Sequence, residues 1–243
     1  MRNRDKLLIG LGVATVAVVA LAAVGYSLGY FDEPAAEADV AVLAEAVEQQ
    51  ATEDVAAGGE VAGTVESLDG TWIIAPVEGQ TFIGYRINEV LTTIGDFTVT
   101  GRTAGVTGTL EGSGTTITAV TVVGDMTSIT TDNPGRDNAM RSQALETEQF
   151  PEATFVLIEP IELGSIPDEG VPITATAIGD LTVHGVTQRV AFPLDAQVQS
   201  GAIVAAGQLE VALADFNINA PSAPIVASVE DVAILELSLV FTR

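Results

Sequence analysis

Alternation of apolar and polar residues, interrupted by clusters of Gly, Pro, Asp and Ser, runs through almost all of the chain after Gly70. Side chains two residues apart in a β-strand point to the same face, so this pattern predicts strands with one buried face. The clusters between the runs predict turns. The candidate strands are 71–75, 81–88, 98–110 (interrupted at Gly101 or Gly105), 115–126, 154–159, 171–181, 187–199, 202–214 and 228–242.

One segment in this region reads as a helix, Pro134–Leu145. Proline suits the first turn of a helix, and Asp132 or Asn133 precedes it as the cap. Strands do not alternate with helices, which argues against a parallel doubly wound sheet. The pattern predicts a mainly β fold with antiparallel strands, as either a closed barrel or a flattened sandwich.

The start of the chain has membrane-protein character. Leu7–Phe31 carries no charge and, at about 1.5 Å per residue, is long enough to cross a hydrocarbon core of roughly 30 Å. Residues 1–6 have a net charge of +2, which leaves −24 − 2 = −26 for the remainder. This asymmetry predicts a single-pass protein of the cell membrane, with its N-terminus inside and its C-terminal domain on the extracytoplasmic side.

A cleaved signal peptide is the alternative for this segment, with Ala20-Leu21-Ala22 as the cleavage site. The apolar run continues past that site, however, and Tyr26, Tyr30 and Phe31 lie where an interfacial aromatic belt would be. These residues favour an uncleaved signal anchor, a transmembrane helix over residues 7–31. The protein is exported under both interpretations.

Between the apolar run and the first strand lies an acidic, Ala- and Glu-rich segment. Asp32–Thr64 contains nine acidic residues and no basic one, which predicts an extended linker that does not pack. Within it, Val40, Leu43 and Val47 fall on one side of a marginal helix. The predicted organisation is a cytoplasmic stub (1–6), a transmembrane helix (7–31), the linker (32–69) and a β-barrel domain (70–243).

Several function classes are excluded or left without support by composition. The chain has no cysteine, so disulfides, thiolate metal sites and thiol catalysis are excluded. A net charge of −24 argues against nucleic acid as a partner. No nucleophile elbow, phosphate-binding loop or metal-ligand spacing is present, so we assign no catalytic residue and no metal site. His184, the only histidine, is expected to be a solvent-facing turn residue.

The stretch Gly179–Asp195 predicts a hairpin that turns at His184-Gly185, with Phe192 and Leu194 facing the interior and Arg189 facing solvent. The sequence of this hairpin, together with further motifs in the same order along the chain, resembles the YceI-like family. Members of that family are lipocalin-like barrels that bind polyisoprenoid lipids. The further motifs are Trp72, Ser128-Ile129-Thr130-Thr131-Asp132, Arg136-Asp137, Arg141, and Phe150-Pro151 followed by Thr154-Phe155.

The resemblance implies an antiparallel lipocalin-like barrel with one short inserted α-helix. It also implies a binding protein, not an enzyme, that holds an isoprenoid quinone or prenol without covalent chemistry. Large apolar residues on the expected strands are candidates for the cavity lining. They are Trp72, Phe82, Tyr85, Phe97, Phe155, Phe192 and Phe216.

Arg136 and Asp137 are candidates for contacts to a polar headgroup, or they tie the start of the helix to neighbouring strand ends, which is the commoner use of such a pair. Two other functions stay open. One is a solid-cored β-domain that binds another envelope protein, and the other is a lipid-modifying enzyme that uses a carboxylate with Arg136. A homodimer is a further possible arrangement.

Overall fold

The computed structural model describes residues 34–59, 63–92, 95–222 and 224–243. The expected stub (1–6) and transmembrane helix (7–31) lie outside these residues. Among the helices that are described, none is both long and apolar enough to cross a bilayer.

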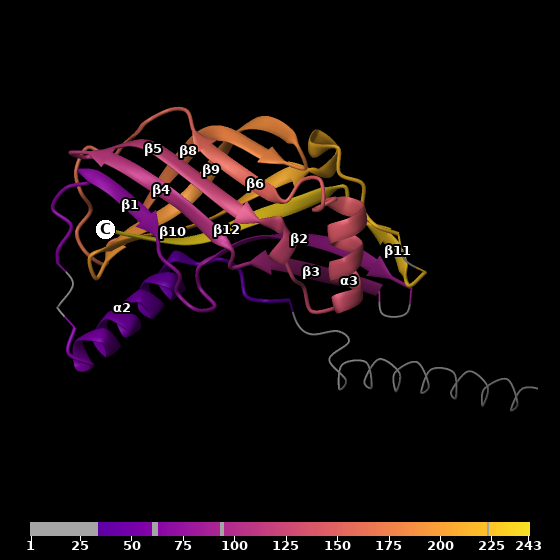
Figure 1. Cartoon of the computed structure of the whole chain (residues 1–243), viewed down its shortest axis with the longest axis horizontal. Coiled ribbons are helices and arrows are strands. Elements are labelled where there is room, and N and C mark those ends of the chain that lie inside the picture. The colour runs from indigo at the N-terminus through magenta and orange to yellow at the C-terminus, as the bar shows by residue number, and fades with distance from the viewer. Residues whose placement is uncertain (1–33, 60–62, 93–94, 223) are drawn as a thin grey trace, which may run out of the picture.

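Most of the described chain is antiparallel β-structure, as the alternation predicts (Figure 1). The strands are β1 (Gly70–Ile74), β2 (Phe82–Leu91), β3 (Gly95–Thr103), β4 (Val106–Ser113), β5 (Thr116–Asp125), β6 (Glu152–Leu157), β7 (Ile161–Glu162), β8 (Ile173–Val183), β9 (Val186–Gln199), β10 (Ala202–Ala212), β11 (Val226–Val229) and β12 (Val232–Thr242). The helices are α2 (Val40–Ala56) and α3 (Pro134–Ala139), with shorter turns η1 (Met126–Ser128), η2 (Met140–Ala144) and η3 (Leu213–Phe216).

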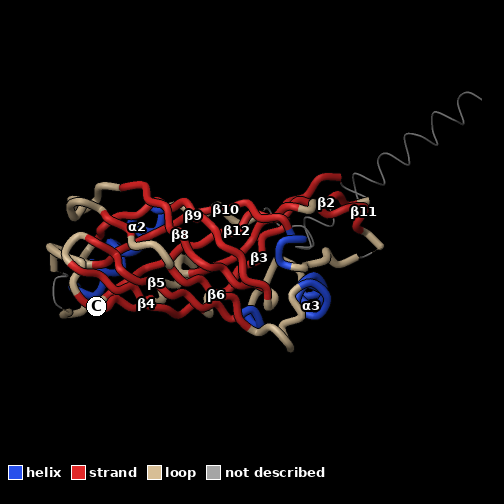
Figure 2. The backbone as a smooth tube through the Cα atoms, turned by 90° about the horizontal axis from the view of Figure 1, so that it is seen from above, coloured by secondary structure: helices blue, strands red, loops and turns tan. Residues whose placement is uncertain are grey.

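The strands close into a barrel. The order β1-β4-β5-β6-β8-β9-β10-β12 returns to its start because β12 also pairs with β1, at Ile73↔Thr242 and Ile74↔Phe241. The first half of β12 instead pairs with β2, which in turn pairs with β3 and β11. One end of the barrel is therefore extended by β2, β3 and β11, and α3 lies beside that extension (Figure 2). This closed ring decides between the barrel and the sandwich.

Two of the expected strands are divided, and one short strand was not expected. The run 98–110 is divided at Ala104-Gly105 into β3 and β4, which is the second of the two interruptions considered. A Cβ at Gly105 would lie 2.9 Å from Ser128 Oγ, so a larger residue here would displace the Ser128 hydroxyl from its hydrogen bond with Thr103 Oγ1. The run 228–242 is two strands, because Glu230-Asp231 turns the chain between β11 and β12. The two-residue strand β7 is too short to show a period in the sequence.

The expected helix at 134–145 is present as α3 and the π-turn η2. Asn133 is its cap, since the Asn133 side chain accepts hydrogen bonds from the backbone N–H groups of Gly135 (2.8 Å) and Arg136 (3.3 Å). Asp132 has another role, as the acceptor of an ion pair from Arg136.

The expectation of an unpacked linker is wrong for residues 40–56. Helix α2 begins at Asp39, whose carboxylate accepts the N–H of Ala41 at 2.7 Å, and it packs on the outside of the barrel. The side with Val40, Leu43 and Val47 is the buried one, as the sequence predicts. The helix docks because the outer face of β10 offers a shallow apolar surface of small residues, Ala202, Val204 and Ala206.

Loss of the Leu43 side chain should loosen this helix. Leu43 is fully buried, so Leu43→Ala is expected to reduce the stability of the docked state by about 2–5 kcal/mol. Hydrogen exchange of residues 40–56 measures the effect. The matched control is Val42→Ala on the same helix, because Val42 is 53% exposed and its loss should cost less than about 0.5 kcal/mol. Equal exchange in the two variants would show that α2 is not docked.

A buried ion-pair group holds the segment before α2. The Glu236 carboxylate is fully buried and accepts from Arg86 Nε at 3.0 Å and from Arg102 Nε at 2.6 Å. The two arginines also donate to the backbone carbonyls of Ala35 and Ala36. We call residues 34–57 the N-terminal strap. It is fixed to the barrel by this group at one end and by α2 at the other.

Candidate functional site

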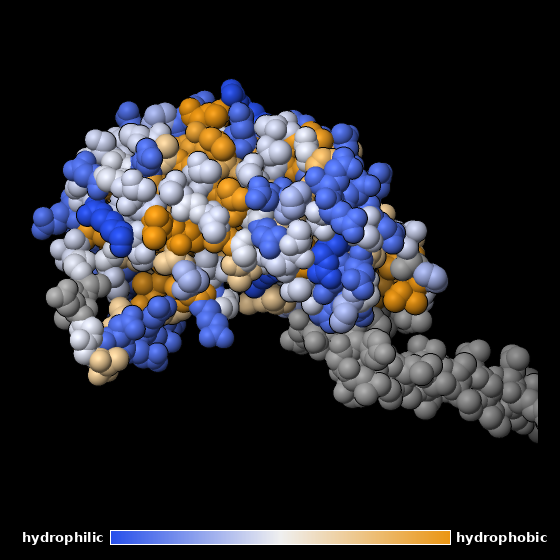
Figure 3. Space-filling view, viewed as in Figure 1, coloured by the Kyte–Doolittle hydropathy of each residue, from blue (hydrophilic) through white to orange (hydrophobic). Residues whose placement is uncertain are grey.

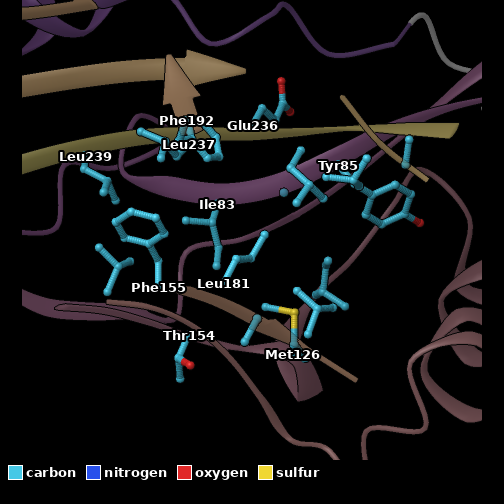
Figure 4. Close-up of a pocket in the computed structure, with 18 of the residues that line it drawn as sticks. Ile83, Tyr85, Met126, Thr154, Phe155, Leu181, Phe192, Glu236, Leu237 and Leu239 are labelled. Atoms are coloured by element: carbon cyan, nitrogen blue, oxygen red, sulfur yellow. The ribbon is translucent and has the colours of Figure 1, made fainter. Parts of the chain in front are cut away.

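The barrel encloses an elongated cavity of about 500 Å³. Its wall is formed by the inward-facing residues of most strands, at every second position, which is what the period of a β-strand dictates. Figure 4 shows the Phe155 ring beside Ile83, with Leu181, Leu237 and Leu239 around them. The lining is almost entirely apolar, so the cavity suits a hydrocarbon ligand and offers few groups for chemistry.

Four of the seven large residues chosen from the sequence line this cavity: Tyr85, Phe155, Phe192 and Phe216. The alternation that the sequence showed in β9 places Phe192 and Leu194 on the cavity wall, as expected for the hairpin. Arg189 is on the other face and exposed, 3.5 Å from Asp180. The sequence did not single out the aliphatic lining, Ile83, Met126, Leu181, Leu235, Leu237 and Leu239 among others. The alternation of side chains along each strand was the signal that could have identified these residues, because they lie on the same face as the lining aromatic residues.

The other three large residues are buried but do not line the cavity. Trp72 is part of a core cluster near one end, where its indole N–H donates to the carbonyl of Leu68 at 3.1 Å. Phe82 faces the opposite side of β2 from Ile83 and lies 3.8 Å below the Arg102 guanidinium. Phe97 packs beside the cavity against Val99.

Polar groups border the cavity at the α3 end. Arg136 donates from Nη2 to Glu89 Oε1 at 2.9 Å and forms a second ion pair with Asp132. Tyr85 lies on the same wall, and Asp132, Glu89 and Asp137 are close enough to affect its titration. Burial raises the pKa of Tyr85 far above its usual value, so the phenol stays protonated and can donate a hydrogen bond. Among the described residues, its hydroxyl has no hydrogen-bond partner.

Asp137 does not face the cavity. Its buried carboxylate accepts from both the N–H and the hydroxyl of Thr131, each at 2.7 Å, and so ties α3 to the loop after η1. Of the two roles considered for the Arg136-Asp137 pair, Asp137 has the structural one. Arg136 takes part in both arrangements, because it pairs with Asp132 and Glu89 and also borders the cavity.

His184 does not face solvent as expected. It occupies the turn with a φ of 50°, but its side chain is only 11% exposed. The two ring nitrogens lie 3.1 Å from the Phe216 carbonyl oxygen and 3.0 Å from Glu146 Oε2, and the ring packs edge-on against Phe150 at 4.7 Å. The left-handed backbone directs the imidazole back over the barrel end, where it closes the packing beneath the turn.

The cavity opens at the end where α3 and β11 lie. The lining residues that are exposed, Gly135, Ala220 and Ile225, all belong to this end, which we call the cavity mouth. At the far end the lining residues are buried or half-buried, with Leu68, Leu110 and Val198 among them. Within the described residues, no group of three or more His, Asp or Glu side chains could hold a metal ion.

Comparison with known proteins agrees with this architecture. The sequence profile of the YceI-like domain matches residues 72–241. Comparison with curated proteins gave no match. A polyisoprenoid-binding domain from Saccharophagus degradans, described as implicated in plant cell wall breakdown, superposes with a TM-score of 0.54 at 16% identity, covering 71% of this chain and 98% of that one.

Two further solved structures are similar over smaller parts of the chain. BcnA from Burkholderia cenocepacia gives a TM-score of 0.49 at 16% identity, covering 65% of this chain and 95% of that one. The YceI protein of Campylobacter jejuni gives a TM-score of 0.44 at 20% identity, covering 58% of this chain and 82% of that one. The profile spans most of the chain, and its bounds coincide with the barrel from β1 to β12. The chain therefore belongs to the YceI-like family.

Proposed function

We propose that the protein binds a polyisoprenoid chain, with a quinone- or prenol-like headgroup, and sequesters or carries it without covalent chemistry. The observation that carries this proposal is the apolar cavity of about 500 Å³, which a solid-cored interaction module would not contain. The Saccharophagus degradans relative, which is described as a polyisoprenoid-binding domain, supports the choice of ligand class.

Burial of hydrocarbon supplies the affinity. Each methylene-sized group moved from water into such a lining gains about 0.8 kcal/mol, so ten groups gain on the order of 8 kcal/mol. Part of this gain is offset by the lost freedom of a flexible chain. Away from the mouth the lining is almost entirely apolar, so the shape and length of the ligand, and not polar contacts, determine how well it fits.

The headgroup is placed at the cavity mouth in this proposal. Tyr85 there offers a protonated hydroxyl without a protein partner, and Arg136 offers a guanidinium whose charge is already balanced by Glu89 and Asp132. A neutral carbonyl or hydroxyl suits such a pair better than a strongly charged group, since no net positive charge is left to bind an anion. This favours quinones and prenols.

We further propose that residues 7–31 anchor the exported barrel in the membrane. Support for this comes from the charge-free sequence and from the charge asymmetry across it. The ligand class fits the location, because isoprenoid quinones and prenols dissolve in the bilayer that such an anchor would occupy.

Retinol, a fluorescent isoprenoid alcohol, tests the binding. Titration of the purified chain should raise retinol fluorescence and saturate at one molecule per chain, because a dry cavity shields the polyene from water. Unlabelled geranylgeraniol should displace it. A linear alcohol of equal carbon number should displace it less well, because it lacks the branching methyl groups. Absence of saturable binding would overturn the proposal.

Tyr85→Phe tests the headgroup placement. The tyrosine hydroxyl makes no hydrogen bond to the described residues, so folding should be little changed by its removal. Affinity for a prenol is expected to fall roughly fivefold, as loss of one net hydrogen bond of about 1 kcal/mol requires. The affinity for a hydrocarbon without a headgroup should not change. An equal loss for both ligands would place the headgroup elsewhere.

A further inference from the structure

The N-terminal strap ends beside the cavity mouth. Pro34 and Ala35 lie in a surface depression together with Thr131 and Asp132, the residues directly before Asn133 on the cavity wall. Arg86 and Arg102 hold the strap here through the carbonyls of Ala35 and Ala36. The point at which the first 33 residues join the barrel is therefore fixed, and it is near the opening.

Exposed apolar side chains surround the same end. Val90, Ile225 and Val232 are 38%, 54% and 44% exposed. They come from neighbouring elements: the N–H of Thr92 donates to the carbonyl of Ile225, and β11 pairs with the end of β2. Apolar surface is visible over β11 in Figure 3. We call Val90, Ile225 and Val232 the apolar rim. Ile225 also lines the cavity, so this rim is continuous with the ligand site.

The length of chain before the strap restricts where the barrel can lie. A span over Leu7–Phe31 leaves only Asp32 and Glu33 before Pro34. At no more than about 3.6 Å per residue, the three steps from Phe31 to Pro34 reach at most about 11 Å. Pro34 must then lie within that distance of the end of the span, and the barrel end that carries the cavity mouth is the end held nearest to it.

We infer that the mouth end of the barrel docks on the surface of a lipid bilayer, with Val90, Ile225 and Val232 in contact with it. The inference rests on the proposed function and on the proposed anchor. It gives the apolar rim a partner, because a hydrophobic patch at the opening of a lipid site is best covered by lipid. The ligand then passes between bilayer and cavity without crossing water.

Charge selects the kind of bilayer. The chain after residue 6 carries −26, and Glu230 and Asp231 lie next to Val232 in the β11–β12 turn. An anionic surface would repel this end, whereas a zwitterionic one would not. Docking should therefore weaken when phosphatidylglycerol replaces phosphatidylcholine at low salt, and recover as salt screens the repulsion.

The absence of cysteine makes the test direct. Ile225→Cys and Ile73→Cys each introduce one labelling site, and the two isoleucines match because both are 54% exposed. Ile73 is in β1, at the opposite end of the barrel (Figure 1). Each full-length variant is labelled with the fluorophore NBD and reconstituted into phosphatidylcholine vesicles that contain a lipid-bound nitroxide quencher. We expect at least threefold stronger quenching at position 225.

A second variant tests the short tether. Insertion of twenty Gly and Ser residues between Glu33 and Pro34 should reduce the quenching at position 225 by roughly half or more, because a longer flexible tether lowers the local concentration of the barrel at the surface. The anchor and the barrel stay intact in this variant. Unchanged quenching would mean that the apolar rim binds the bilayer without help from the short tether. That result would overturn the part assigned to the tether in docking.

The outcomes separate this inference from the proposed function. Equal quenching at positions 225 and 73, together with saturable retinol binding by the unlabelled wild-type chain, would overturn docking and leave the binding function standing. Stronger quenching at position 225, together with no retinol binding by the unlabelled wild-type chain, would support docking and overturn the binding function.

Discussion

Ala177→Trp is expected to lower the affinity for isoprenoids at least tenfold. Ala177 lies in β8 with its side chain on the cavity wall, packed in one cluster with Phe155 and Phe192. An indole there would fill the middle of the channel, so a long chain could not pass from the mouth to the far end. The extra volume should cost about 1–3 kcal/mol of stability. Retinol titration of the folded variant measures the loss.

The matched control is Ala191→Trp. Ala191 is on the adjacent strand β9, pairs with Ile178 and faces solvent. This change adds the same side chain outside the barrel, so retinol affinity should stay within a factor of two. Equal affinities of the two variants would show that the ligand does not occupy the cavity.

Glu236→Gln is expected to reduce stability by about 3–5 kcal/mol, because it removes the charge that balances two buried or half-buried arginines. The amide keeps the shape of the carboxylate, so the loss reports on charge and not on packing. Denaturant unfolding followed by circular dichroism measures it. The strap should also exchange its amide hydrogens faster, since Arg86 and Arg102 hold it in place.

Glu210→Gln is the control for that change. Glu210 is exposed on β10, the strand next to β12, and it forms no ion pair with the described residues. Its replacement should alter stability by less than about 0.5 kcal/mol. If the two variants unfold at the same denaturant concentration, the Glu236 ion pairs do not hold the strap.

The β-fold could be predicted from sequence because strand alternation and turn residues are local signals. The Gly179–Asp195 hairpin and the capped helix at Pro134 are clear cases. The docking of α2 could not be predicted, since its partner surface consists of small residues on β10 more than 140 positions away. The ion pairs of Glu236 could not be predicted either, because Arg86 and Arg102 are separated from Glu236 by 150 and 134 positions.

The cavity could be predicted only in part. Phe192 belongs to the alternating run Val190, Phe192 and Leu194, so its inward direction follows from the sequence. Phe82 is followed directly by Ile83, and both faces of β2 are covered, the outer one by Arg102 and the N-terminal strap. A strand buried on both faces gives no sign of which face borders a cavity. The closure of the barrel decides this, and it depends on the pairing of β12 with β1.

Native mass spectrometry of the full-length protein, followed by lipid extraction, tests the central claim most directly. Protein purified from membranes in mild detergent should carry one isoprenoid quinone or prenol per chain, and delipidated protein should take up one added isoprenoid. The Ala177→Trp variant should do neither. Recovery of wild-type protein without ligand, together with no uptake of added isoprenoids, would contradict the claim.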